Sequence, residues 1–92
     1  MKITYDQNKN QRNIEERNLP FDLAIDFHWD TALIEPDLRK HYPEPRYVAA
    51  GFVGTTERLH ILVFTPIIGG IRVISLRKAN KREVKHYENR RL

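Results

Sequence analysis

Apolar residues along the chain fall into runs that predict five strands. Three of the runs are long and rich in β-branched residues, and two are short. The expected strands cover residues 2–5, 31–35, 46–53, 59–65 and 71–76. The connections at 54–57 and 66–70 are short and contain turn-forming residues such as glycine and proline. The last three strands should therefore form antiparallel hairpins.

Two helices are expected before the second strand. The first follows Asp6, a good N-cap residue, and covers the almost wholly polar residues 8–17. The second begins at Pro20 and carries an apolar stripe at positions i, i+3 and i+4. This stripe consists of Phe21, Ala24 and Ile25. The second helix should pack on the sheet, whereas the first has little apolar surface with which to dock.

The order of these elements, with a last helix after the fifth strand, is β-α-α-β-β-β-β-α. It predicts an α+β fold with a mainly antiparallel sheet packed by helices. Ninety-two residues fit one domain, so we expect a single domain over residues 1–92. The polar segment 37–44 is framed by prolines and is expected to be the most mobile part of the chain.

The net charge of +4 is concentrated near the carboxyl end. Residues 72–92 contain eight Lys or Arg residues and two Glu residues, a balance of +6, so residues 1–71 together carry −2. The last helix begins in this segment, where Asn80 is a suitable N-cap and Glu83 completes a capping box. Such concentrated charge predicts a surface for an anionic partner, of which RNA is the leading candidate.

Several kinds of site are excluded by the residue types present. The chain has no cysteine, which rules out disulfides and thiolate zinc sites. The four histidines lack the spacing of a zinc site and no glycine-rich phosphate loop occurs, so we expect no metal or cofactor. The amino terminus lacks the apolar core of a signal peptide, and no apolar run approaches the ~20 residues that span a bilayer. We expect a soluble, cytoplasmic protein that does not bind membranes.

The strand at 71–78 combines an apolar pattern with cations. Strict alternation places Arg72 with Ile74 on one face of the sheet, and Arg77 with Ser75 on the other. A β-bulge, or the end of the strand, would bring the two arginines to one side. The alternative is that both arginines lie at an edge in surface ion pairs.

Two residues of the last helix are candidates for chemistry. Glu83 and Tyr87 are four residues apart and therefore face the same side. Glu83 could act as a general base, orient an arginine, or only cap the helix. Tyr87 could stack on a base, donate a proton, or pack its ring in the core.

Cleavage of RNA needs no metal when the 2′-hydroxyl of the substrate is the nucleophile. It requires a base near that oxygen, cations that stabilise the phosphorane, and an acid for the leaving oxygen. Arginine suits the second task because its planar fork matches phosphate oxygens. The chain is rich in arginine and poor in candidate acids and bases, which is typical of small RNA-cleaving or RNA-binding domains.

The same residues resemble a known family. Residues 72–79 have the sequence RVISLRKA, and with Glu83 and Tyr87 they are similar to the carboxyl-terminal signature of BrnT toxins. Arg46 corresponds to an arginine that opens the family's central strand, with Gly51 shortly after it. Weaker similarities in the first half are Tyr5-Asp6, Lys9, Asn13, Phe21 to Ala24, and Phe27 with Asp30.

This resemblance implies a RelE-like fold and a ribonuclease toxin of a type II toxin–antitoxin pair, which inhibits translation and growth. The implied partners are an RNA substrate and a BrnA-type ribbon-helix-helix antitoxin, through which the toxin reaches operator DNA. The expected catalytic residues are Arg46, Arg72, Arg77, Glu83 and Tyr87. The residues expected to bind RNA are Lys9, Arg17, Ser75, Lys78 and Lys81.

One segment differs from the family pattern. The family usually has Lys-His-Gly after the first helix, where this chain has Glu16-Arg17-Asn18. Because Arg17 replaces a histidine, a second hypothesis is a toxin-like module that binds its antitoxin or RNA without cleaving. A third is direct DNA binding by the basic helix, which is disfavoured because the sequence lacks the helix pair of a helix-turn-helix.

Overall fold

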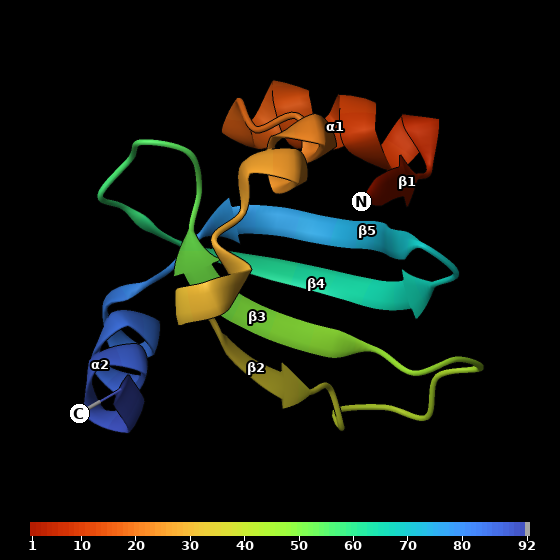
Figure 1. Ribbon diagram of the computed structural model, residues 1–92. Coiled ribbons are helices and arrows are strands. Elements are labelled where there is room, and N and C mark those ends of the chain that lie inside the picture. Colours follow the sequence, from red (N-terminus) through yellow and green to blue (C-terminus); the bar gives the residue numbers. More distant parts are fainter. Residues whose placement is uncertain (92) are drawn as a thin grey trace.

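The computed structural model describes residues 1–91, which form one sheet with helices around it (Figure 1). The strands within these residues are β1 (Lys2–Tyr5), β2 (Leu33–Pro36), β3 (Tyr47–Phe52), β4 (Leu59–Ile67) and β5 (Gly70–Lys78). The helices are α1 (Gln7–Arg17), the 3₁₀ helices η1 (Phe21–Asp26) and η2 (Trp29–Thr31), and α2 (Lys81–Arg91). None of the described helices is long and apolar enough to span a membrane.

The strands form a single sheet in the order β1-β5-β4-β3-β2. Each strand from β2 to β5 pairs antiparallel with the next strand in the chain, so the predicted hairpins are confirmed. β1 is the exception, because it pairs parallel to β5 at the edge of the sheet. The expected α+β class is confirmed, and the arrangement is consistent with a RelE-like fold.

The pairing of β1 with β5 depends on Gly70. The register places Lys2 opposite Gly70, and the Lys2 amide donates a hydrogen bond of 2.9 Å to the carbonyl of Gly69. A Cβ atom on Gly70 would lie 1.8 Å from the Lys2 carbonyl oxygen. Only glycine therefore allows β1 to approach β5 this closely.

The sheet buries an apolar layer on each of its faces. The larger layer is covered by η1 and η2, and its buried residues are Leu19, Phe21, Ala24, Phe27, Ala49, Val53, Leu62, Phe64, Ile71, Val73 and Leu76. The smaller layer lies on the opposite side and consists of Ala50, Leu59, Ile61, Val63 and Ala79. Because Val84 and Tyr87 of α2 pack against it, we call this side of the sheet the α2 face.

Two asparagines, rather than an apolar stripe, attach α1 to the rest of the fold. The buried Asn13 donates from Nδ2 to the carbonyls of Leu19 at 2.7 Å and Leu76 at 2.9 Å. Asn10 accepts the backbone N–H of Phe21 at 2.8 Å. These bonds explain how an almost wholly polar helix docks on the strands.

The helix caps predicted from the sequence are present at the amino ends of α1 and α2. Asp6 accepts the backbone N–H of Lys9 at 2.9 Å, so the predicted N-cap of α1 is confirmed. At α2, Asn80 accepts the N–H of Glu83 at 2.8 Å, and Glu83 accepts the N–H of Asn80 at 2.9 Å. The predicted capping box is therefore present.

Two predictions for residues 20–35 were wrong, namely the type of the second helix and the start of the second strand. The second helix is a 3₁₀ helix, in which residues three apart are eclipsed, so Phe21 and Ala24 point into the core together. Ile25, expected in the same stripe, is instead 56% exposed. Thr31 ends η2, and β2 begins only at Leu33.

A β-bulge changes which residues of β5 face α2. Phe64 pairs with Val73 and Val63 pairs with Ser75, so Ile74 is an extra residue in β5. The alternation is reversed after the bulge. Arg72 and Arg77, which strict alternation separates, therefore both face the α2 side of the sheet.

Candidate functional site

The α2 face carries arginines at both ends of β5. Arg72 lies near the start of the strand and Arg77 near its end. At about 3.3 Å per residue, their Cα atoms are roughly 15 Å apart. The structure therefore brings the two arginines to one face but places them in different parts of it.

Arg46, Thr65 and Arg72 form a row across three neighbouring strands, which we call the arginine row. Thr65 pairs with Arg72 in the sheet. Arg46 directly precedes Tyr47, which pairs with Phe64. Continuing this register by one residue places Arg46 opposite Thr65, on the side of β4 away from Arg72. With strands about 4.8 Å apart, the Cα atoms of the two arginines are roughly 10 Å from each other. Both side chains are long enough to reach a ligand above Thr65.

Two polar atoms of the arginine row lack partners. Thr65 is 1% exposed, and its hydroxyl and the Nε of Arg46 are buried without a hydrogen bond to any described residue. Buried polar groups are normally hydrogen-bonded, and leaving one unpaired is costly. Thr65 was not identified from the sequence, because its unpaired state depends on strands that are distant in the chain. The row has the chemistry of a site for an anionic oxygen ligand.

The ion pairs among the side chains of residues 1–90 do not neutralise the arginine row. They are Arg39–Asp37 and Arg77–Glu83, and neither arginine of the row takes part. A guanidinium without a carboxylate partner remains available to a phosphate, whose oxygens its fork matches.

Arg77 is held by Glu83 at the α2 end of the face. Its two terminal nitrogens each donate to one carboxylate oxygen at 2.8 Å. The hydrogen bonds from Arg77, assisted by the Asn80 amide, hold the pKa of Glu83 below its ordinary value. The same bonds raise the pKa of Arg77, although burial and, less strongly, the charge of Arg39 act in the opposite direction. Glu83 is therefore ionised and has both of its oxygens in use.

The hydroxyl of Tyr87 is also in use. It donates to the carbonyl of Thr31 at 2.8 Å, which ties α2 to the end of η2. The ring packs edge-on against Phe52, with centroids 5.9 Å apart. These contacts are those of a residue that positions the helix.

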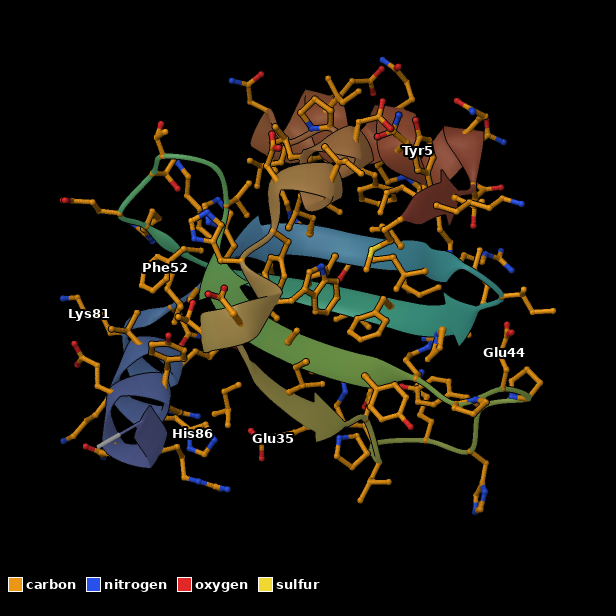
Figure 2. The ribbon with its side chains drawn as sticks, in the orientation of Figure 1. Tyr5, Glu35, Glu44, Phe52, Lys81 and His86 are labelled. Atoms are coloured by element: carbon orange, nitrogen blue, oxygen red, sulfur yellow. The ribbon has the colours of Figure 1, made fainter. Side chains whose placement is uncertain are left out.

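A histidine–carboxylate pair lies on the same face. Figure 2 shows His86 of α2 beside Glu35 of β2, and the ring Nε2 is 3.0 Å from the Glu35 carboxylate. Glu35 was not identified from the sequence, because only the packing of α2 on β2 brings it to His86. Within residues 1–91, no group of three or more His, Asp or Glu side chains is arranged to hold a metal ion.

The residues expected to bind RNA are spread around the α2 face and the edge of β5. Lys9, Arg17 and Ser75 line a shallow depression between α1 and β5. Arg17 also reaches a second depression, which Lys78 lines at the end of β5. Lys81 opens α2, as Figure 2 shows. These residues surround the arginines rather than form one patch with them.

Most of the chain matches the model of a known protein family. Residues 5–83 match the family model described as the ribonuclease toxin BrnT of a type II toxin–antitoxin system. The chain belongs to the BrnT family. It is a ribonuclease toxin, and its action therefore involves an RNA substrate and a cognate antitoxin. No curated protein matches the chain at a significant level.

The segment that differs from the usual BrnT pattern has structural roles here. Asn18 occupies a left-handed conformation with φ of 58°, which glycine adopts freely and asparagine tolerates. Arg17 donates to the side chain of Asn13 at 2.7 Å and so supports the residue that docks α1. This BrnT chain thus has no imidazole at the end of α1 to carry a proton.

A hydrogen-bond network after β2 supports the arginine row of this toxin. The buried Asp37 accepts two N–H bonds from the Arg39 side chain, at 2.9 and 2.8 Å, and the hydroxyl of Tyr42 at 3.1 Å. The Arg39 guanidinium holds the pKa of Asp37 well below its ordinary value. The guanidinium of Arg46 lies over the Tyr42 ring, 3.9 Å from its centroid. Asp37 and Arg39 were not identified from the sequence. The signal that could have indicated this network is an aspartate at the end of a strand with an arginine two residues later.

Proposed function

We propose that this BrnT toxin cleaves RNA on its α2 face without a metal ion, using the 2′-hydroxyl of the substrate as nucleophile. The 2′-oxygen bonds to phosphorus and the bond to the 5′-oxygen breaks. The products carry a 2′,3′-cyclic phosphate and a 5′-hydroxyl. The observation that supports this most strongly is the arginine row, in which two arginines without ion pairs flank a buried, unpaired hydroxyl.

Within this proposal the arginines have separate tasks. Arg46 and Arg72 hold the scissile phosphate and stabilise the charge that develops on its oxygens. Arg77 lies roughly 15 Å from Arg72 along β5. It therefore binds a different phosphate of the same RNA strand. Glu83 orients Arg77, and Tyr87 positions α2. Lys9, Arg17, Ser75, Lys78 and Lys81 contact the flanking RNA.

The partner we propose is a BrnA-like ribbon-helix-helix antitoxin. It would neutralise the toxin by covering the α2 face and would carry it to operator DNA. The single toxin domain would act on RNA in the cytoplasm and inhibit translation and growth. The family membership and the concentration of positive charge support this proposal.

Cleavage in the presence of a chelator tests the proposed chemistry. We expect purified toxin, freed of antitoxin, to cleave an oligoribonucleotide in EDTA and to leave 2′,3′-cyclic phosphate ends. An oligonucleotide of the same sequence with 2′-O-methyl groups should bind but remain intact. Cleavage that requires added Mg²⁺ would contradict the proposed mechanism.

A second candidate function is binding of RNA or antitoxin without cleavage. It is favoured by one observation, namely that Glu83 and the Tyr87 hydroxyl are both hydrogen-bonded within the fold. In that case the toxin would bind the unmodified and the 2′-O-methyl oligonucleotide equally well. Neither would be cut, even with toxin in large excess.

A further inference from the structure

The His86–Glu35 pair lies between the two arginine groups of the α2 face. The register across the sheet runs from Glu35 to Val48, then to Val63 and Ser75. This line of residues is one step along the face from the arginine row, and Arg77 lies one step beyond it on the other side. His86 thus projects from α2 over the β2 and β3 side of the face, at a level between the arginine row and Arg77.

We propose that His86 is the general base of this toxin and that Glu35 is its positioning residue. The inference rests on the proposed function and deepens it by naming the group that removes the proton. The imidazole takes the proton of the 2′-hydroxyl as the 2′-oxygen bonds to phosphorus. The 5′-oxygen leaves as its bond to phosphorus breaks, and it is protonated by water.

The geometry of the pair suits this task. Glu35 accepts the Nε2 hydrogen at 3.0 Å, which leaves the lone pair of Nδ1 free to accept a proton. Glu35 also stabilises the imidazolium that forms, as a carboxylate does when it orients a catalytic histidine. Both side chains remain open to a substrate, with exposed fractions of 51% for His86 and 45% for Glu35.

The other candidates on this face are less suited. The hollow around His86 has an apolar floor of Val48, Ala50 and Ile61, and its remaining charged groups are Glu35 and Glu83. Glu83 is ionised but uses both oxygens to bind Arg77. His86 can accept a proton at Nδ1 while it keeps its bond to Glu35, and neither residue of the pair is bound to an arginine.

Substitutions of the pair test the inference. We expect His86→Gln, which can still donate to Glu35, to lower the single-turnover cleavage rate about 100-fold at neutral pH. Lys85→Gln, at the preceding position of α2, is the matched control and should retain the normal rate. Glu35→Gln should lower the rate about tenfold without changing the binding of the 2′-O-methyl oligonucleotide.

Chemical rescue separates a catalytic from a structural role. Added imidazole should restore cleavage by His86→Ala, because a free imidazole can replace the missing base but cannot repair a destabilised helix. A His86→Gln toxin that cleaves at the normal rate would overturn this inference alone, provided that Arg72→Ala is impaired. An unaltered toxin that does not cleave RNA would overturn both the proposed function and the inference.

Discussion

At the scale of single residues, substitution of Tyr87 tests whether this residue of α2 has a structural or a chemical role. Tyr87→Phe removes the hydrogen bond to Thr31 but retains the ring beside Phe52. We expect a loss of about 1 kcal/mol in the free energy of unfolding and a cleavage rate within about twofold of normal. Urea unfolding and single-turnover cleavage measure the two effects. A large fall in cleavage with unchanged stability would instead identify Tyr87 as a proton donor.

Asp37 and Glu83 should make the fold sensitive to acid. Both pKa values are lowered in the folded state from their ordinary values of 3.8 and 4.5. The stabilisation from each carboxylate is therefore complete above about pH 5 and is lost as the pH falls through the folded-state pKa. We expect Asp37→Asn to cost about 1–2 kcal/mol at pH 7 and to weaken the dependence of stability on pH below 5.

Urea unfolding between pH 3 and 7 checks this expectation. Glu44→Gln is the matched control, because Glu44 is exposed at the tip of the same segment (Figure 2). If Asp37→Asn and the unaltered protein lost stability in parallel below pH 5, the buried carboxylate would not be the source of the acid sensitivity.

At the scale of elements, features set by local chemistry could be predicted from the sequence. The N-caps Asp6 and Asn80 were predictable because each bonds a backbone amide within the next three residues. The bulge at Ile74 was foreseen only as a possibility, because its position depends on which residue of β4 faces Val73. The 3₁₀ form of η1 was missed, since residues 21, 24 and 25 fit an α-helical stripe equally well.

Gly70 provides a test at the scale of elements. We expect Gly70→Ala to displace β1 from the sheet, because the new Cβ would lie 1.8 Å from a backbone oxygen that no side-chain rotation can move. The loss of stability should exceed about 2 kcal/mol. Hydrogen exchange of the amides at residues 2–5 should increase, while β3 and β4 keep their protection. Ile68→Ala in the same turn is the control, because Ile68 is 99% exposed.

At the scale of the whole molecule, the sequence predicted the family, the fold class and the candidate residues Arg46 and Arg72, but not that these two residues lie on either side of Thr65. The arginine row combines residues 46, 65 and 72, which meet only because β3, β4 and β5 are neighbours. The concentration of cations in residues 72–92 predicted a localised surface for an anionic partner. The structure instead distributes charge from the arginine row past Arg77 to the start of α2. An RNA that contacts the whole face must therefore extend over several nucleotides.

The single-turnover cleavage rate of Arg72→Ala tests the central claim most directly. Arg72 is exposed and outside the ion pairs of the described chain, so its removal should leave the fold intact. We expect cleavage to fall by about 100-fold or more, because the variant loses a cation that stabilises the transition state. Arg82→Ala removes an equal charge from the exposed side of α2 and should cleave at nearly the normal rate. Equal rates for Arg72→Ala and Arg82→Ala would contradict the assignment of the arginine row as the site that holds the scissile phosphate.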